Sequence, residues 1–222
     1  MHNKSDMEAL IQECATLHRH LCPRQVLGIR MGLLGGELLG IEVPQNNKRM
    51  LTVVETDGCG ADGIAVATNC WVGRRTMRIL DFGKVAATFI DRKSEQAFRV
   101  YPNPTARKVA PNYAPDAGNR WEAYLLGYQR MPTDELLIAQ PVKIAFSLEK
   151  LWSKNGKRVN CAECGEEIIN EREVVRNGVI LCRSCAGERY YHTINSDGTI
   201  TAPPVDVFHL TNALTPETII LT

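Results

Sequence analysis

Apolar side chains recur at helical spacing through the first forty residues of the chain. One series predicts a helix that ends near His18, because its members share a face at a period of 3.6 residues: Met7, Leu10, Ile11, Cys14, Leu17 and Leu21. A second helix is predicted to begin at Pro23, since proline suits the first helical turn. This second helix contains glycines that permit close packing: Gly28, Gly32, Gly35 and Gly36.

The middle of the chain contains both strand and helix patterns. Runs of β-branched and apolar residues predict strands at 50–56, 76–80, 85–91, 97–101 and 142–148. Helices are predicted at 61–69 and 120–130 and, for a short one, from Thr133, whereas the proline-rich stretch 102–119 is predicted to be a long surface loop. Because strands and helices do not alternate strictly, we expect an α+β fold in which helices pack on a mainly antiparallel sheet.

A different pattern follows residue 153. Two CxxC pairs, Cys161 with Cys164 and Cys182 with Cys185, stand seventeen residues apart. This spacing indicates a structural zinc site, because each pair presents two sulfurs to one ion and four thiolates leave zinc no open position. An iron–sulfur or redox site and cysteines that only fill space are the alternatives.

The segment between the cysteine pairs predicts a β-hairpin centred on Asn177-Gly178, followed by a short helix through Glu188 to Tyr191. Together with the CxxC spacing, this order resembles a treble clef and the four-cysteine zinc fingers of the DksA/TraR type. We therefore expect a core domain at 1–153 and a zinc-finger module with a tail at 154–222. The sequence assigns no role to residues 192–222.

Composition and charge limit the classes of partner. The 222 residues carry a net charge of +1, and no run reaches the roughly 18 apolar residues of a membrane-spanning helix. Between Lys157 and Tyr191, six basic residues balance six glutamates, which argues against nucleic acid as a partner and favours protein contact or dimerisation. Without a signal-peptide pattern, we expect a cytoplasmic protein with reduced thiols.

A second group of metal-capable side chains lies near the N-terminus. His18, His20 and Cys22 alternate along the chain, so in an extended connection they point to one side and converge on one ion, with Cys59 further along the sequence. Zinc accepts histidine and cysteine together, and three protein ligands leave a position for water or substrate. The alternative is a turn with two solvated histidines and a buried cysteine.

The other cysteines of the first 150 residues differ in their expected roles. Cys22 and Cys59 stand where helices are predicted to begin, a position that lowers the pKa of a thiol, so each is a candidate ligand or nucleophile. Cys70 lies eleven residues beyond Cys59, or about 16 Å along a continuous helix. Cys70 is therefore a less favoured ligand than Cys59, and we expect it in the wall of the pocket or in the core. Cys14 belongs to the apolar stripe of the first helix and is expected in the core.

Four blocks of the sequence form a pattern in the first part of the chain: Leu17-His18-Arg19-His20-Leu21-Cys22-Pro23, Glu55-Thr56-Asp57-Gly58-Cys59-Gly60-Ala61-Asp62, Thr68-Asn69-Cys70 and Asp81-Phe82-Gly83-Lys84. In this order they resemble the FmdE family, named after a component of molybdenum or tungsten formylmethanofuran dehydrogenase, over about residues 10–150. The resemblance implies a dimer whose core gathers the histidines and cysteines of these blocks in a pocket. It adds Asp62 and Lys84 to Cys59 as candidate catalytic residues, the alternative being a solvated turn acid and a surface lysine.

The chain also departs from the family pattern. Arg19 and Arg24 replace glycines, which favours an anionic ligand or marks divergence from the family activity. Three functions follow. The first is an accessory or metal- or cofactor-handling protein of a molybdenum or tungsten enzyme, with a structural zinc ion and a second, core metal ion. The others are a metal- or thiol-dependent enzyme acting on a small anion, and a regulatory zinc-finger protein that contacts polymerase or nucleic acid.

Overall fold

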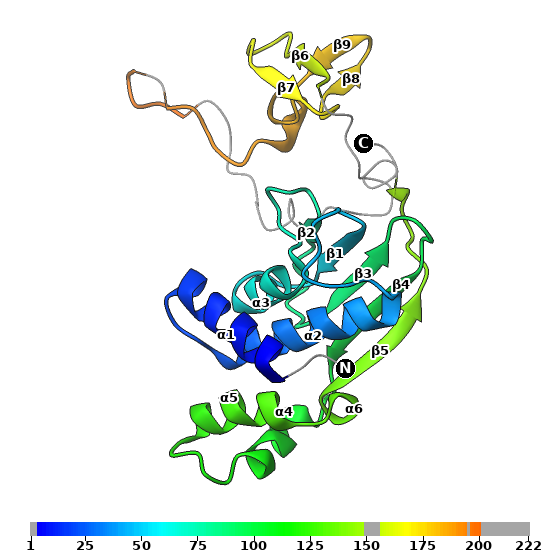
Figure 1. The fold of residues 1–222 in the computed structure, drawn as a ribbon. Helices are drawn as coiled ribbons and strands as arrows, with labels where there is room; N and C mark the ends of the chain where they lie inside the picture. The colour runs from blue at the N-terminus through cyan, green and yellow to red at the C-terminus, as the bar shows by residue number, and fades with distance from the viewer. Residues whose placement is uncertain (1–3, 149–155, 195, 201–222) are drawn as a thin grey trace. The chain divides into compact units, whose positions relative to one another are not determined.

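The computed structural model describes residues 4–148, 156–194 and 196–200, and the chain divides into two compact units, 1–144 and 145–222 (Figure 1). The predicted domain boundary between residues 153 and 154 lies outside the described residues, as does the tail from residue 201. Within the described ranges, no helix is both long and apolar enough to cross a membrane.

The first unit is built on one five-stranded sheet with the order β2-β1-β3-β4-β5. Its strands are β1 (Met50–Val54), β2 (Met77–Ile79), β3 (Ala87–Asp91), β4 (Ala97–Pro102) and β5 (Leu137–Val142). Only the β1–β2 pair is parallel, and the other three pairs are antiparallel. The central strands β1 and β3 are buried along their whole length. The predicted α+β class with a mainly antiparallel sheet is confirmed.

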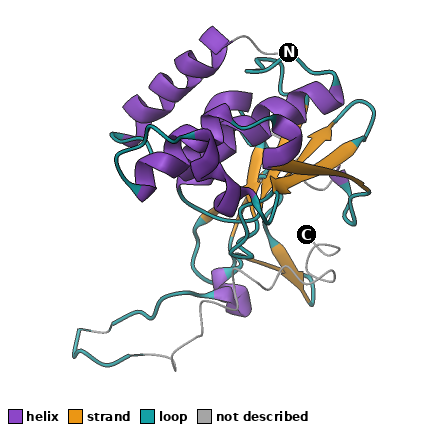
Figure 2. Cartoon of the chain, turned by 90° about the horizontal axis from the view of Figure 1, so that it is seen from below, coloured by secondary structure: helices purple, strands orange, loops and turns teal. Residues whose placement is uncertain are grey.

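The first three helices of the chain lie together on one side of this sheet (Figure 2). They are α1 (Lys4–His18), α2 (Pro23–Leu39) and α3 (Cys59–Thr68). A second group follows β4 and consists of α4 (Ala106–Val109), a 3-10 turn (Ala110–Tyr113), α5 (Arg120–Arg130) and α6 (Thr133–Leu136). The core between helices and sheet is centred on Phe89, Ile29 and Met50, each fully buried.

Two local predictions were wrong. The strand expected at 142–148 lies instead at Leu137–Val142, because β4 pairs with that segment from Ala97↔Val142 to Pro102↔Leu137. Pro141 is tolerated there because β5 is an edge strand, where a missing N–H costs no ladder bond. The stretch 102–119 is not simply a surface loop: it contains α4 and the 3-10 turn, and Ala110 is fully buried against Gly127 of α5.

The closest helix contact in the unit is between α2 and α3. A Cβ atom on Gly28 would stand 2.3 Å from the Gly60 carbonyl oxygen, and one on Gly63 would stand 2.2 Å from the Gln25 carbonyl oxygen. Gly32 approaches Ala67, further along both helices, so the two helices run parallel with their N-termini at the same end. Glycine is needed here because no side chain fits between the two backbones. The close packing predicted for the second helix is confirmed.

A buried arginine joins α2 to the end of α5. The Arg30 guanidinium donates hydrogen bonds to the carbonyl oxygens of Tyr128 (2.9 Å), Gln129 (3.3 Å) and Met131 (3.0 Å) and to the Thr133 hydroxyl (2.9 Å). Burial lowers the pKa of Arg30. The cation nonetheless satisfies carbonyl groups that a helix end leaves without intrahelical donors, and it complements the negative end of the α5 dipole.

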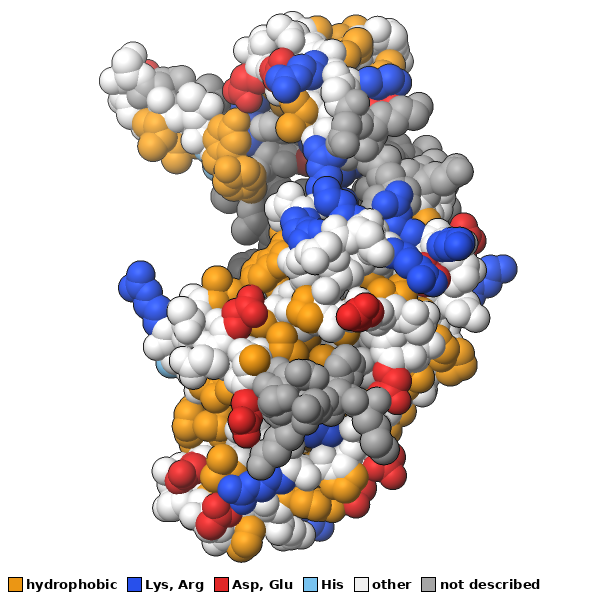
Figure 3. All heavy atoms as spheres, viewed as in Figure 1, with side chains coloured by type: hydrophobic (Ala, Val, Ile, Leu, Met, Phe, Trp, Pro, Cys, Tyr) orange, Lys and Arg blue, Asp and Glu red, His pale blue; other side chains and the backbone are white. Residues whose placement is uncertain are grey.

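Charged side chains also tie the loops beside the sheet together. Figure 3 shows Lys and Arg side chains gathered over the part of the core unit that carries β1 and β2. Arg49 forms two hydrogen bonds of 2.9 and 2.8 Å with the buried carboxylate of Asp91, and its guanidinium holds the pKa of Asp91 well below its usual range. Arg74 donates to the Asn46 carbonyl oxygen at 3.1 Å. Part of this positive charge therefore serves loop structure.

The described part of the second unit contains two short hairpins and one helical turn. One hairpin joins β6 (Arg158–Asn160) to β7 (Glu167–Ile169), and the other joins β8 (Val174–Arg176) to β9 (Val179–Leu181) through Asn177-Gly178, both at positive φ. This second hairpin confirms the sequence prediction. The following helical turn, η2 (Ser184–Glu188), ends before Tyr191, because the chain leaves helical geometry at Gly187 (φ 103°).

We expect Gly28→Ala to lower the free energy of unfolding by at least about 2 kcal/mol, because the new methyl group meets backbone atoms of α3 that cannot turn aside. Urea unfolding followed by far-ultraviolet circular dichroism measures the change. Gly73→Ala is the matched control: a Cβ at Gly73 has open space and should leave stability unchanged or raise it by up to about 1 kcal/mol. Equal stability of the two variants would contradict the assigned role of the α2–α3 contact.

Candidate metal centres and an adjoining cleft

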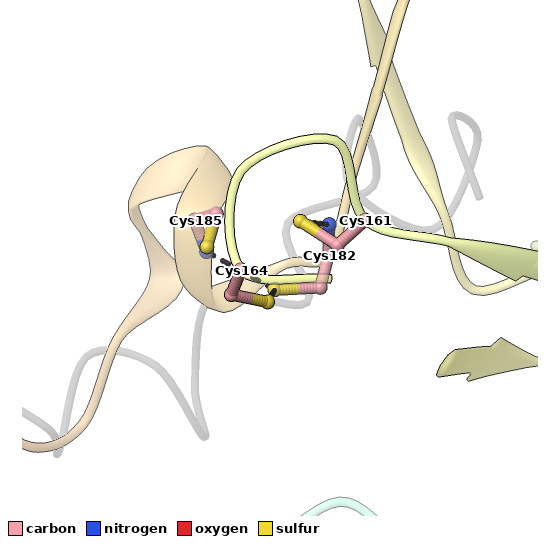
Figure 4. Close-up of side chains that lie close together, drawn as sticks. All are labelled: Cys161, Cys164, Cys182 and Cys185. Carbon is pink, nitrogen blue, oxygen red and sulfur yellow. Dashed lines mark hydrogen bonds between the residues drawn. The ribbon is translucent and has the colours of Figure 1, made fainter. Parts of the chain in front are cut away.

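The four cysteines of the second unit come together as the CxxC spacing predicts. Their sulfur atoms all lie within 4.8 Å of one another: Cys161 and Cys164 are on the turn after β6, Cys182 is just before η2, and Cys185 is within it (Figure 4). The Sγ atoms of Cys164 and Cys182 are 3.9 Å apart. Two thiolates on a tetrahedral zinc ion with bonds of about 2.3 Å stand about 3.8 Å apart, so the spacing fits this metal.

Hydrogen bonds favour charged sulfur in this cluster. The backbone N–H of Cys182 donates to Cys161 Sγ at 3.2 Å, and that of Cys185 donates to Cys182 Sγ at 3.3 Å. Backbone donors, chiefly Cys164 and then Cys182, lower the pKa of Cys161 to about 6. Burial and hydrogen bonds with the neighbouring thiols raise the pKa of Cys185 to about 12. A cation is therefore what allows four thiolates to coexist, as in a structural zinc site.

A second group forms where α1 ends and α3 begins. His18 is the last residue of α1 and Cys59 the first residue of α3, and together with His20 they offer ligand atoms within 4.8 Å of one another. Gly58 precedes α3 with φ 81° and ψ −154°, a conformation open essentially to glycine alone. The histidines do not alternate along an extended connection as predicted, because Arg19 between them is left-handed (φ 61°).

Asp62 orients one of these histidines. Its carboxylate is 2.9 Å from His18 Nδ1, and His18 Nε2 is 3.5 Å from Cys59 Sγ. A histidine that donates from Nδ1 to a carboxylate keeps Nε2 unprotonated and ready to bind a metal. Cys59 and Asp62 occupy the first turn of α3, three residues apart, so the helix itself sets their spacing. The expectation of a merely solvated turn acid at Asp62 does not fit this contact.

The other cysteines of the first unit lie outside the group of three. Cys22 caps α2, where its N–H donates to the Gln25 side chain at 2.6 Å. Burial, together with a hydrogen bond to Cys22, raises the pKa of Cys59, opposite to the effect expected of a helix N-terminus. Cys70 is fully buried and receives a hydrogen bond of 3.2 Å from Gln45, and burial raises its pKa. Cys14 is fully buried in the core.

A cleft of about 750 Å³ opens beside Cys59. Arg24 and Leu27 line it from α2 and Cys22 from the N-cap of that helix, whereas Lys84 lines it from the loop before β3 and Arg107 from α4. The loop that carries Lys84 is held by the Glu55 carbonyl oxygen, which accepts from the backbone N–H of Phe82 at 2.9 Å and of Lys84 at 3.1 Å. Of the candidate catalytic residues, Cys59 and Lys84 therefore share this cleft, while Asp62 contacts His18.

Sequence reasoning missed the aromatic wall of the cleft. Trp121, Tyr124 and Tyr128 line it from one face of α5, and Tyr101 lines it from β4. Their spacing on α5, at positions i, i+3 and i+7, was the available signal. Hydrogen bonds, chiefly from Arg120 and then from Arg107, lower the pKa of Tyr124.

The ion pair between Glu55 and Arg99 also escaped prediction. Glu55 is buried, and its carboxylate accepts two hydrogen bonds of 2.6 and 2.7 Å from Arg99. The Arg99 guanidinium in turn lies 4.9 Å from the centre of the Tyr101 ring. The cation of Arg99 and the ring of Tyr101 therefore lie together in the cleft wall, and the carboxylate of Glu55 neutralises the charge of Arg99.

Comparisons with known proteins agree with both resemblances. The family model described as "FmdE, Molybdenum formylmethanofuran dehydrogenase operon" matches residues 17–138, more than half of the chain. The model of the prokaryotic DksA/TraR C4-type zinc finger matches residues 156–191. A four-cysteine zinc finger after an FmdE-type core is thus confirmed, and the cysteine cluster is a zinc-binding site.

Two individual proteins are similar to the chain. A "Probable S-adenosyl-L-methionine-binding protein" of Archaeoglobus fulgidus is 30% identical over 213 residues, covering 84% of this chain. The chain spans 55% of the length of that relative. The crystal structure of an FmdE-like protein, of the tungsten formylmethanofuran dehydrogenase type, from Syntrophus aciditrophicus superposes with a TM-score of 0.53 at 21% identity, covering 83% of this chain and 94% of the other. The second likeness shows a shared fold.

We expect Cys161→Ser to unfold the zinc finger and to spare the core, because zinc binding supplies roughly 10–16 kcal/mol of apparent folding energy to such modules. In amide NMR spectra of the full chain, signals of 158–188 should collapse to random-coil positions while those of β1 and β3 stay in place. Glu163→Gln, an exposed substitution between the same two cysteines, is the control and should leave both sets unchanged. An intact finger in Cys161→Ser would show that the metal does not hold this unit.

Proposed function

Because this chain belongs to the FmdE family, we propose that it is an accessory protein that handles a metal or cofactor for a molybdenum or tungsten enzyme. In this proposal the core holds one metal ion, most simply zinc, and the finger makes protein contacts. The observation that carries it is the chain of contacts from Asp62 through His18 to Cys59. A carboxylate behind a ligating histidine is a recurrent support of metal sites in proteins.

The spacing of the core group fits the same metal. A histidine nitrogen and a thiolate on tetrahedral zinc stand about 3.6 Å apart, from bond lengths of about 2.05 and 2.3 Å. The distance between His18 Nε2 and Cys59 Sγ is 3.5 Å. With His20 as third ligand, one position stays open toward a ligand, in the manner of catalytic and transfer sites rather than structural ones. Cys22, which forms a hydrogen bond with Cys59, is the candidate fourth ligand; if it binds, the ion has four protein ligands and no open position.

The surface of the finger supports a docking role. Several of its large apolar side chains are exposed, with Val175 62% and Tyr190 75% accessible, together with Ile169, Val179 and Tyr191. A module this small cannot bury all its apolar groups, and such surfaces favour protein contacts. The partners we propose are a second copy of the chain and subunits of a molybdenum or tungsten enzyme, after the operon for which the family is named. The proposed location is the cytoplasm.

A thiol- or metal-dependent enzyme is the second candidate function. The series Cys59, His18 and Asp62 has the order of a nucleophile, a base and an orienting carboxylate, with Lys84 in the same cleft. The two candidates differ in whether Cys59 is bound to a metal. Alkylation of Cys59 by iodoacetamide, followed by peptide mass spectrometry, separates them: protection of Cys59 by metal supports the accessory metal site, whereas fast alkylation of metal-replete protein supports the nucleophile.

The relative from Archaeoglobus fulgidus adds S-adenosyl-L-methionine as a candidate cofactor. Its adenine ring suits the aromatic side of the cleft. Its sulfonium and ammonium charges do not suit Arg24, Lys84 and Arg107, which line the same cleft. We therefore propose S-adenosyl-L-methionine only as a comparison ligand for this chain.

We expect two zinc equivalents per full-length chain by inductively coupled plasma mass spectrometry, one in the finger and one in the core. Cys59→Ser should remove the core equivalent, and Cys161→Ser should remove the finger equivalent. Asp62→Asn should keep both at saturation but weaken the core site about 10- to 100-fold in competition with a chromophoric chelator, because His18 loses its orienting carboxylate.

Asp57→Asn is the matched control for the core site. Asp57 precedes α3 and is exposed, and it lies outside the group of three ligands, so its substitution should leave both metal affinities unchanged. A metal content of one equivalent that is lost only with the finger cysteines would refute the core metal site. It would leave the thiol enzyme as the better account of His18, Cys59 and Asp62.

A further inference from the structure

The cleft beside Cys59 presents aromatic surface to a ligand. Trp121 and Tyr124 line it from the same face of α5, and Trp121 is 52% exposed there. Tyr128, which is buried, stacks behind Tyr124 with ring centres 6.1 Å apart and keeps that ring in place. An accessible indole beside a supported phenol ring is a surface on which a planar ring can stack.

The same cleft carries uncompensated positive charge. Four cations line it, Arg24, Lys84, Arg99 and Arg107, and no aspartate or glutamate is among the lining residues. Glu55 neutralises Arg99 from behind the wall. Among the described residues, neither Arg24 nor Lys84 has a carboxylate within ion-pair distance, and both are exposed. The charge left over is therefore positive, and low-dielectric aromatic walls strengthen its effect on an anion.

Ring surface and positive charge also meet at Arg107. The Arg107 guanidinium lies 5.3 Å from the centre of the Tyr124 ring, so one planar cation lies over an aromatic face inside the cleft. Arg24, by contrast, lies next to Pro23 and Cys22 at the start of α2. A ligand in this cleft can thus contact the rings, Arg107 and the unpaired cations of Arg24 and Lys84.

We propose that this cleft binds an organic anion in which a planar heteroaromatic ring is joined to a phosphate or carboxylate group, as in a nucleotide or a pterin cofactor. The ring stacks on Trp121 and on the Arg107 guanidinium that lies over Tyr124, and the anionic group pairs with Arg24 and Lys84. The volume of about 750 Å³ lies in the usual range for such ligands. This ligand class specifies the cofactor of the proposed function. It rests on that function because Cys59, which lines the cleft, is also a ligand of the proposed metal site.

Isothermal titration calorimetry on the full-length, zinc-replete protein tests this ligand class. The probes are adenosine 5′-monophosphate and folic acid, which combine ring and anion, and adenosine and inorganic phosphate, which separate them. We expect at least one combined probe to bind at least about tenfold more tightly than either separate one. Tighter binding of the nucleotide or of the pterin then identifies the source of the ring.

Substitutions of residues that line the cleft test which side chains contact the ring and which contact the anionic group. Trp121→Ala should weaken the combined probe about tenfold, and Lys84→Gln should weaken it about tenfold while leaving adenosine unchanged, since each removes one kind of contact. Lys108→Gln is the matched control for Arg107→Gln: both residues are exposed on α4, and only Arg107 lines the cleft. The control should bind as the native chain does, and Arg107→Gln should bind severalfold more weakly.

Three results would overturn this ligand class. The first is that neither combined probe gives saturable heat. The second is that inorganic phosphate binds as tightly as the combined probes. The third is that S-adenosyl-L-methionine binds more tightly than both combined probes. Metal content measured on the same preparations tests the core metal site separately. If a probe binds to protein that holds no core metal, the ligand class stands and the proposed metal site is wrong. If the core metal is present and no probe binds, the metal site stands and the ligand class is wrong.

Discussion

The rest of the core unit depends on the contact between the backbones of α2 and α3. Glycines at 28 and 63 bring main-chain atoms of the two helices so close that no Cβ atom fits between them. Because the helices run parallel, their first residues lie at the same end, and this is how Cys22 and Cys59, 37 positions apart in the sequence, come to line one cleft. A slip of either helix along the other would separate the thiols and draw Asp62 away from His18.

Arg30 extends this arrangement to the opposite wall of the cleft. It lies on α2 two residues after Gly28, and its four hydrogen bonds end at the C-terminal turn of α5 and at Thr133. One helix therefore fixes both the thiol side of the cleft, through α3, and the aromatic side, through α5. The burial of a charged group is tolerated here because helix carbonyls with no other donor surround it.

The sequence was sufficient for several features that depend on local spacing, although the alternation expected of His18 and His20 failed because Arg19 is left-handed. The CxxC pairs, the Asn177-Gly178 turn and the start of α2 at Pro23 each follow from residues that are neighbours in the chain. Prediction failed where a distant partner decides. The segment 142–148 has strand-forming residues, yet β4 pairs with 137–142, and nothing local to Pro141 indicates that choice. Likewise, Asp62 was named through family resemblance, but its contact with His18 arises only when α1 returns to the start of α3.

Because His18 is the last residue of α1, a metal ion at this site would also affect the stability of that helix. A bound ion at His18, His20 and Cys59 would fasten the N-terminal helix to α3, and the free energy of binding would add to the stability of that helix. The supply of metal in the cell would then govern how often α1 detaches from α3.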